Sequence, residues 1–161
     1  MSSKLKISFL ILFGLLFSAC GNINNCSSVP SEPVFIRLNT DYHMWLINTD
    51  FASRTFLVTD RTSIFTYVRA IGYGGVFISV TNAAKGHISA FDMTCPYEMD
   101  SNIRVFPDEN GLSAVCERCR SRFDLSWGLG NRIEGPAPEN LRRLNVQRQG
   151  IWLIITQSRC G

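Results

Sequence analysis

The chain has 161 residues, of which 45% are hydrophobic and 18% are charged, and its formal net charge is +3. This length is typical of one domain, and this hydrophobic fraction excludes a wholly disordered chain. Without Lys4 and Lys6, which lie in the N-terminal segment described next, 14 basic residues stand against 13 acidic ones. A nearly neutral domain lacks the basic face that nucleic acids require, so nucleic acid is not an expected partner.

The first 20 residues have the features of an export signal. Two lysines precede an apolar run at residues 7–17, which is shorter than the roughly 20 residues of a membrane-spanning helix. The sequence FSAC, which ends at Cys20, resembles the bacterial lipobox, in which the cysteine is acylated and becomes the new N-terminus. We therefore expect residues 1–19 to be a lipoprotein signal peptide. Lipidated Cys20 would then hold the protein on the lipid bilayer of the bacterial cell envelope, facing outside the cytoplasm.

A polar segment separates Cys20 from the first apolar run. Residues 21–33, GNINNCSSVPSEP, are mostly Asn, Ser and Pro, which is typical of a flexible linker. We expect residues 20–33 to be a mobile tether and residues 34–161 to form the folded domain. Cys26 and Cys160 lie just outside the first and last expected strands. If the ends of the domain meet, as domain termini often do, a disulfide between these two cysteines would restrain the tether.

Short apolar runs, often alternating with polar residues, follow the tether. They are rich in β-branched and aromatic residues and are often separated by Gly, Asn, Asp or Pro, which predicts strands. The predicted strands are residues 34–38, 54–58, 64–70, 75–81, 87–92, 112–116 and 151–156. Residues 41–48 and 138–143 instead favour a helical turn. No segment after residue 33 has a long apolar stripe at helical spacing, so the expected fold class is all-β, an antiparallel sandwich or barrel.

Three cysteines within the expected β-domain are candidates for chemistry. Cys95 follows a predicted strand, and Cys116 and Cys119 form a CxxC pair at the end of another. Three thiols on two loops suit a soft metal ion. In an exported protein, however, a CxxC pair also forms disulfides. The spacing by itself leaves a metal site, a disulfide and unrelated thiols open.

The sequence around these cysteines is more specific than their spacing. FDMTCPY at 91–97 and VCERCRSRFDLSWGLGNRIEGPAPENLRRLNV at 115–146 resemble the Rieske iron–sulfur domain. The resemblance runs from about Gly72 to about Val146. In that family, Cys-x-His and Cys-x-x-His loops hold a 2Fe–2S cluster, and a Gly-Pro-Ala-Pro-like loop closes over it. The resemblance therefore implies a Rieske-like antiparallel β-sandwich of stacked small sheets, with two cysteine loops and a Pro loop at one end. It places the residues that cover the cluster at Ser121, Gly135, Pro136, Ala137 and Pro138.

The ligand positions depart from the family pattern. Tyr97 stands at the first histidine position, Cys119 stands at the second, and Arg120 replaces the glycine that follows it. The resemblance implies that Cys95 and Cys116 keep the inner iron, while Tyr97 and Cys119 replace the ligands of the outer iron. Because neutral imidazoles raise the potential of a Rieske centre, thiolate and phenolate ligands imply a lower potential.

Three functions remain open on this sequence. The first is a 2Fe–2S electron-transfer lipoprotein with altered ligands, which would act with a redox protein partner. The second is a cluster-free structural or binding lipoprotein, in which Cys95 is bonded to Cys116 or Cys119. The third is a zinc-bound version of the same fold.

An oxygenase is disfavoured, because it needs a separate iron site of two histidines and a carboxylate and the chain has only two histidines. We therefore expect an electron carrier or a non-catalytic domain rather than an enzyme.

Overall fold

The computed structural model describes residues 27–57, 63–82 and 85–158. The predicted signal peptide, the lipidation site at Cys20 and the proposed Cys26–Cys160 disulfide lie outside these residues and stay predictions. Within the described residues, no helix is long and apolar enough to cross a membrane. The elements are β1 (Val34–Asn39), α2 (Trp45–Asn48), β2 (Ser53–Phe56), β3 (Thr66–Ile71), β4 (Val76–Asn82), β5 (His87–Asp92), β6 (Val105–Pro107), β7 (Ser113–Cys116), β8 (Arg122–Asp124), β9 (Asn131–Glu134), β10 (Asn145–Gln149) and β11 (Trp152–Thr156).

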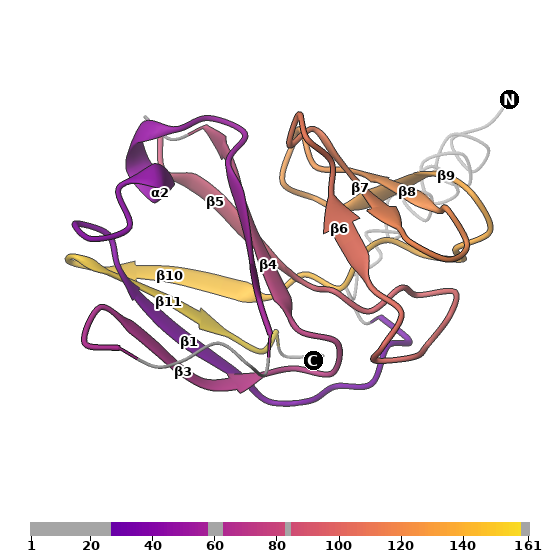
Figure 1. Cartoon of the computed structure of the whole chain (residues 1–161), viewed down its shortest axis with the longest axis horizontal. Helices are drawn as coiled ribbons and strands as arrows, with labels where there is room; N and C mark the ends of the chain where they lie inside the picture. The colour runs from indigo at the N-terminus through magenta and orange to yellow at the C-terminus, as the bar shows by residue number, and fades with distance from the viewer. Residues whose placement is uncertain (1–26, 58–62, 83–84, 159–161) are drawn as a thin grey trace, which may run out of the picture.

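The described strands form antiparallel sheets in the orders β10-β11-β1-β3, β2-β4-β5 and β6-β7-β8-β9. Figure 1 shows the β6–β9 sheet set to one side of the other two sheets. The all-β class predicted from the sequence is confirmed. So are the stacked small sheets with two cysteine loops and a Pro loop at one end. The reason is local: alternating side chains point to opposite faces of a strand, so a short strand can bury an apolar face against another sheet.

The first hydrophobic core, here called the aliphatic core, draws its buried side chains from the β10-β11-β1-β3 and β2-β4-β5 sheets and from α2. Ile36 and Leu38 of β1 are fully buried in it, while Arg37 between them is exposed. The buried members of this core all carry hydrocarbon side chains: Val34, Ile36, Leu38, Leu46, Phe56, Val76, Ile78, Val80, Ala90, Leu144, Leu153 and Ile155.

The second hydrophobic core, here called the cysteine core, joins the β6–β9 sheet to β4 and β5. Its buried members are Phe77, Phe91, Met93, Cys95, Val105, Ala114, Cys116, Phe123, Leu125, Ala137 and Leu141. Strand β4 belongs to both cores, because Ile78 points into the aliphatic core and Phe77 into the cysteine core. Phe77 stacks on Phe91 of β5 with ring centroids 5.1 Å apart. A strand buried on both faces needs no polar alternation, which explains the nearly continuous apolar run VFISV in β4.

All seven strands predicted from the sequence overlap observed strands, and the turn predicted at 41–48 contains α2. The helical turn predicted at 138–143 is wrong. Arg143 instead forms an isolated bridge with Phe91, and the carbonyl of Arg142 accepts a hydrogen bond from the backbone N–H of Asp92. Pairing with the β5 segment therefore overrides the local helical preference. Strands β6, β8, β9 and β10, which are short or mostly polar, are not predicted from the sequence.

Part of the expected tether packs on the domain. Val29 is buried, and its carbonyl accepts a hydrogen bond of 2.6 Å from the guanidinium of Arg142. The hydroxyls of Ser27 and Ser28 donate to the carboxylate of Glu139 at 2.6 and 2.8 Å. The packed part of the chain thus begins earlier than the sequence predicts, and it reaches the residue that follows the Pro loop.

Candidate metal centre

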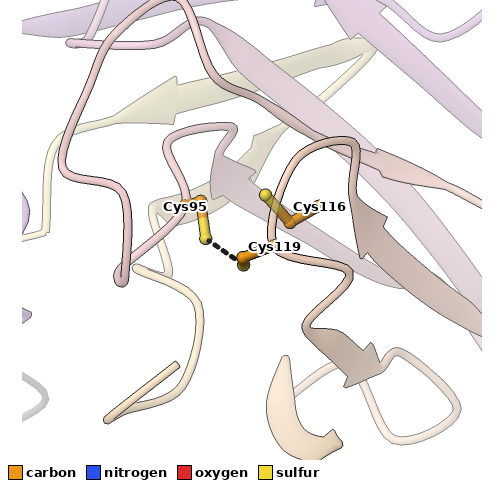
Figure 2. Close-up of side chains that lie close together, drawn as sticks. All are labelled: Cys95, Cys116 and Cys119. Atoms are coloured by element: carbon orange, nitrogen blue, oxygen red, sulfur yellow. Dashed lines mark hydrogen bonds between the residues drawn. The ribbon is translucent and has the colours of Figure 1, made fainter. Parts of the chain in front are cut away.

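Three thiols from two loops converge at the β6–β9 end of the domain. Cys95 lies just after β5, Cys116 is the last residue of β7, and Cys119 lies in the turn that follows β7. Their sulfur atoms all lie within 4.8 Å of one another, and the Cys95 and Cys119 sulfurs are 3.6 Å apart (Figure 2). The structure thus brings together the three cysteines that the sequence singled out.

A buried carboxylate fixes the first cysteine loop. Asp92 is 2% exposed and accepts hydrogen bonds from the backbone N–H and the hydroxyl of Thr94, at 2.8 and 2.6 Å. It also accepts from the backbone N–H groups of Tyr73 and Gly74, so several donors satisfy its buried oxygen atoms. This role of Asp92 is not predicted from the sequence. The signal was an Asp at a strand end with a Thr two residues later, a pattern typical of side-chain-to-backbone turns.

The second cysteine loop is a tight turn. The backbone N–H of Cys116 donates to the carbonyl of Ser121, and the N–H of Arg120 donates to the carbonyl of Cys116. Arg120 has φ +61°, in the left-handed region that non-glycine residues adopt at a cost of about 1–2 kcal/mol. This is the position where the Rieske pattern has glycine. Arg120 therefore carries backbone strain that a glycine would not.

The Pro loop is attached to the site through Ser121. The hydroxyl of this buried serine lies 3.1 Å from the Cys119 sulfur and accepts a hydrogen bond of 3.0 Å from the backbone N–H of Ala137. Gly135 has φ +90°, and a Cβ atom there would lie 2.5 Å from the Cα atom of Ser121. Of the loop residues, Ala137 is buried in the cysteine core, whereas Gly135, Pro136 and Pro138 are exposed.

The three thiols differ in acidity. Burial raises the pKa of Cys95 to about 12, and burial also raises the pKa of Cys116. Burial alone would raise the pKa of Cys119 as well. Hydrogen bonds from the hydroxyl and the backbone N–H of Ser121, together with the other two thiols, outweigh burial and lower that pKa. Cys119 is also partly exposed, whereas Cys95 and Cys116 are fully buried. The site therefore holds two buried thiols that resist ionisation and one accessible thiol that ionises more easily.

The remaining candidate residues lie outside this group of sulfurs. Tyr97 is two residues after Cys95, and its side chain is 53% exposed. Its role as a fourth ligand stays a prediction. His43 is buried elsewhere in the fold, where its Nε2 atom lies 2.6 Å from the Thr66 hydroxyl. His87 is exposed at the start of β5.

No family model matches the chain, and no curated protein matches it significantly. Among solved structures, it is similar to the plasma membrane Rieske protein PetC3 of the cyanobacterium Synechocystis PCC 6803. The two chains are 26% identical with a TM-score of 0.42, and the similarity covers 51% of this chain and 76% of that one. The function proposed below therefore rests on the residues of the site.

Proposed function

We propose that this protein is a Rieske-like metal-binding domain whose centre is held by Cys95, Cys116 and Cys119. The observation that carries the proposal is the convergence of three sulfur atoms, all within 4.8 Å of one another, from two loops. Thiolate sulfur is the donor that zinc and iron–sulfur centres use. Burial raises the pKa of Cys95 and Cys116, which disfavours their thiolate forms. A bound cation would favour deprotonation, because metal ligands bind as thiolates.

The first candidate for the centre is a 2Fe–2S cluster, which supplies one-electron transfer when it is bound. The order of the two cysteine loops and the Pro loop supports it. In this proposal, Cys95 and Cys116 hold the inner iron, and Cys119 and Tyr97 hold the outer iron. Thiolate and phenolate are charged where imidazole is neutral, so the potential lies below that of a two-histidine centre. In this form the protein is an electron carrier that acts with a redox protein partner.

The separation of the sulfurs favours a second candidate, a single zinc ion. Zinc–sulfur bonds of about 2.3 Å in a tetrahedral site place two sulfurs about 3.8 Å apart. The Cys95 and Cys119 sulfurs are 3.6 Å apart. Terminal ligands on different irons of a cluster lie farther apart, because bridging sulfides separate the irons. In the zinc form, three thiolates and a fourth donor would make a structural or binding module.

Metal and sulfide analysis of the full chain, purified without oxygen, separates these candidates. Two irons and two acid-labile sulfides per chain, with visible absorption, would establish the cluster. One zinc ion in a colourless protein would establish the second candidate. A protein with neither metal would contradict both. Replacing a ligand in Cys119→Ser should lower the metal content. The matched control Arg118→Gln removes a charge that pairs with Glu98, leaves the three thiols in place, and should keep the metal content.

We also propose that Cys20 carries a lipid and holds the domain on the bilayer of the bacterial cell envelope. The FSAC sequence at the end of the apolar run supports this proposal. Mass spectrometry of the mature N-terminus tests it directly. The expected result is a chain that begins at an acylated Cys20. An unmodified N-terminus downstream of Cys20 would contradict the proposal.

A further inference from the structure

The three thiols differ in their exposure to solvent, and this difference suggests a chemistry in addition to metal binding. Cys119 is partly exposed, while Cys95 is fully buried. A contact of 3.6 Å between sulfur atoms joins this accessible thiol to that buried one (Figure 2). It joins residues of two different loops rather than the two ends of the CxxC turn.

The surroundings of Cys119 suit an attacking thiol. The Ser121 hydroxyl lies 3.1 Å from the Cys119 sulfur and helps to hold it in the turn. An accessible thiol with a buried partner within reach is the minimal arrangement for dithiol–disulfide exchange.

We propose that, when it holds no metal, this site exchanges disulfides, with Cys119 as the attacking thiol and Cys95 as the resolving thiol. The substrate class is an accessible disulfide, either of a small thiol or on a protein surface. The Cys119 thiolate attacks one sulfur of the substrate, whose S–S bond breaks as a mixed disulfide forms. The first substrate thiolate leaves and takes up the proton that Cys119 lost.

The second step completes the exchange. The Cys95 sulfur attacks the Cys119 sulfur, the mixed disulfide breaks, and the second substrate thiolate leaves and takes the proton that Cys95 gives up as it attacks. The protein has then lost two electrons and holds a Cys95–Cys119 disulfide, while the substrate has gained two electrons as two thiols. Cys116 takes no part. Because the same two sulfurs serve as metal ligands in the proposed function, bound metal should block the exchange.

Peptide mapping of the full chain after reaction with glutathione disulfide tests this proposal. We expect chelator-treated wild-type protein to contain a Cys95–Cys119 disulfide and a free Cys116. In Cys95→Ser, glutathione should remain attached to Cys119, because the resolving thiol is missing. Arg118→Gln, a change in the same turn that leaves all three thiols in place, is the matched control, and it should still form the Cys95–Cys119 bond.

Other outcomes would overturn the proposal. A bond between Cys116 and Cys119, glutathione on Cys95 or Cys116, or an unmodified Cys119 in metal-free protein would each do so. The wild-type map needs no variant, so a misfolded variant does not remove the test. Protein that never binds metal but forms the Cys95–Cys119 bond would contradict only the metal-binding function. Metal-binding protein that fails to exchange after chelation would contradict only this inference.

Discussion

The aliphatic core and the cysteine core are built by the same kind of antiparallel strand but have different interiors. The buried members of the aliphatic core are all hydrocarbon side chains, whereas the cysteine core contains Met93 and two buried thiols, with Cys119 packed against it. Hydrocarbon side chains stabilise a fold by being removed from water and need no partner. Buried thiols bring ionisation, metal binding and oxidation into the interior. The aliphatic core therefore depends mainly on packing, whereas the cysteine core depends also on the chemical state of its sulfurs.

The largest expected effect comes from removing a buried side chain of each core. Phe123→Ala in the cysteine core should lower the free energy of unfolding by about 3–5 kcal/mol, because it leaves a cavity beside the cysteine loops. It should also abolish the specific reactivity of Cys119. Leu153→Ala in the aliphatic core should cost about 2–5 kcal/mol and leave that reactivity unchanged in the folded protein. Urea unfolding and alkylation kinetics measure both effects. Equal changes in alkylation would show that the two cores are not separate.

Removing the proposed metal should destabilise the half of the molecule that contains the cysteine core. At a free metal concentration 100 times its Kd, the loss of unfolding free energy is about 2.7 kcal/mol. Hydrogen exchange should accelerate in β6–β9 after chelation, while the amides of β1 and β11 keep their protection. Exchange that accelerates evenly over all sheets would contradict this localisation.

Two glycines with positive φ, one beside the thiols and one far from them in the β10–β11 turn, allow a second test. Gly135→Ala should lower the unfolding free energy by about 1–3 kcal/mol and speed the alkylation of Cys119, because the new Cβ atom would push the Pro loop away from Ser121. Gly150, in the β10–β11 turn, has φ +59° and open space around it. Gly150→Ala should therefore cost only about 1 kcal/mol of backbone strain and leave alkylation unchanged. If both variants alter alkylation alike, the Pro loop does not shield the thiol.

The smallest expected effect is a pH dependence outside the cysteine core. Burial, followed by the nearby charge of Arg54, lowers the pKa of His43 below its usual value of 6.5. The unfolded chain then binds the proton more readily, so stability is full above about pH 6.5 and falls as the pH drops toward the folded pKa. Urea unfolding of the wild type and His43→Gln, above and below that pH, measures the contribution. An equal pH dependence in both proteins would exclude His43 as its source.

The sequence determined the features that depend on local pattern. The run HISAFD predicted a strand at residues 87–92, and the structure has β5 over the same residues. Alternation and β-branched content are properties of a single segment, so the all-β class followed without knowledge of the packing. The two cysteine loops were recognised because their turns and ligand positions are short, contiguous motifs.

Distances, pKa values and packing contacts between residues far apart in the chain follow only from the tertiary structure. It places the Cys95 and Cys119 sulfur atoms 3.6 Å apart. Burial in the fold raises the pKa of Cys95, and hydrogen bonds from Ser121 help to lower the pKa of Cys119. The tertiary structure turned residues 138–143 away from a helix by pairing Arg143 with Phe91. It also packed Val29 against Arg142, which lies 113 residues later. Burial and long-range hydrogen bonds arise only when separate segments meet, so no local pattern of residues encodes them.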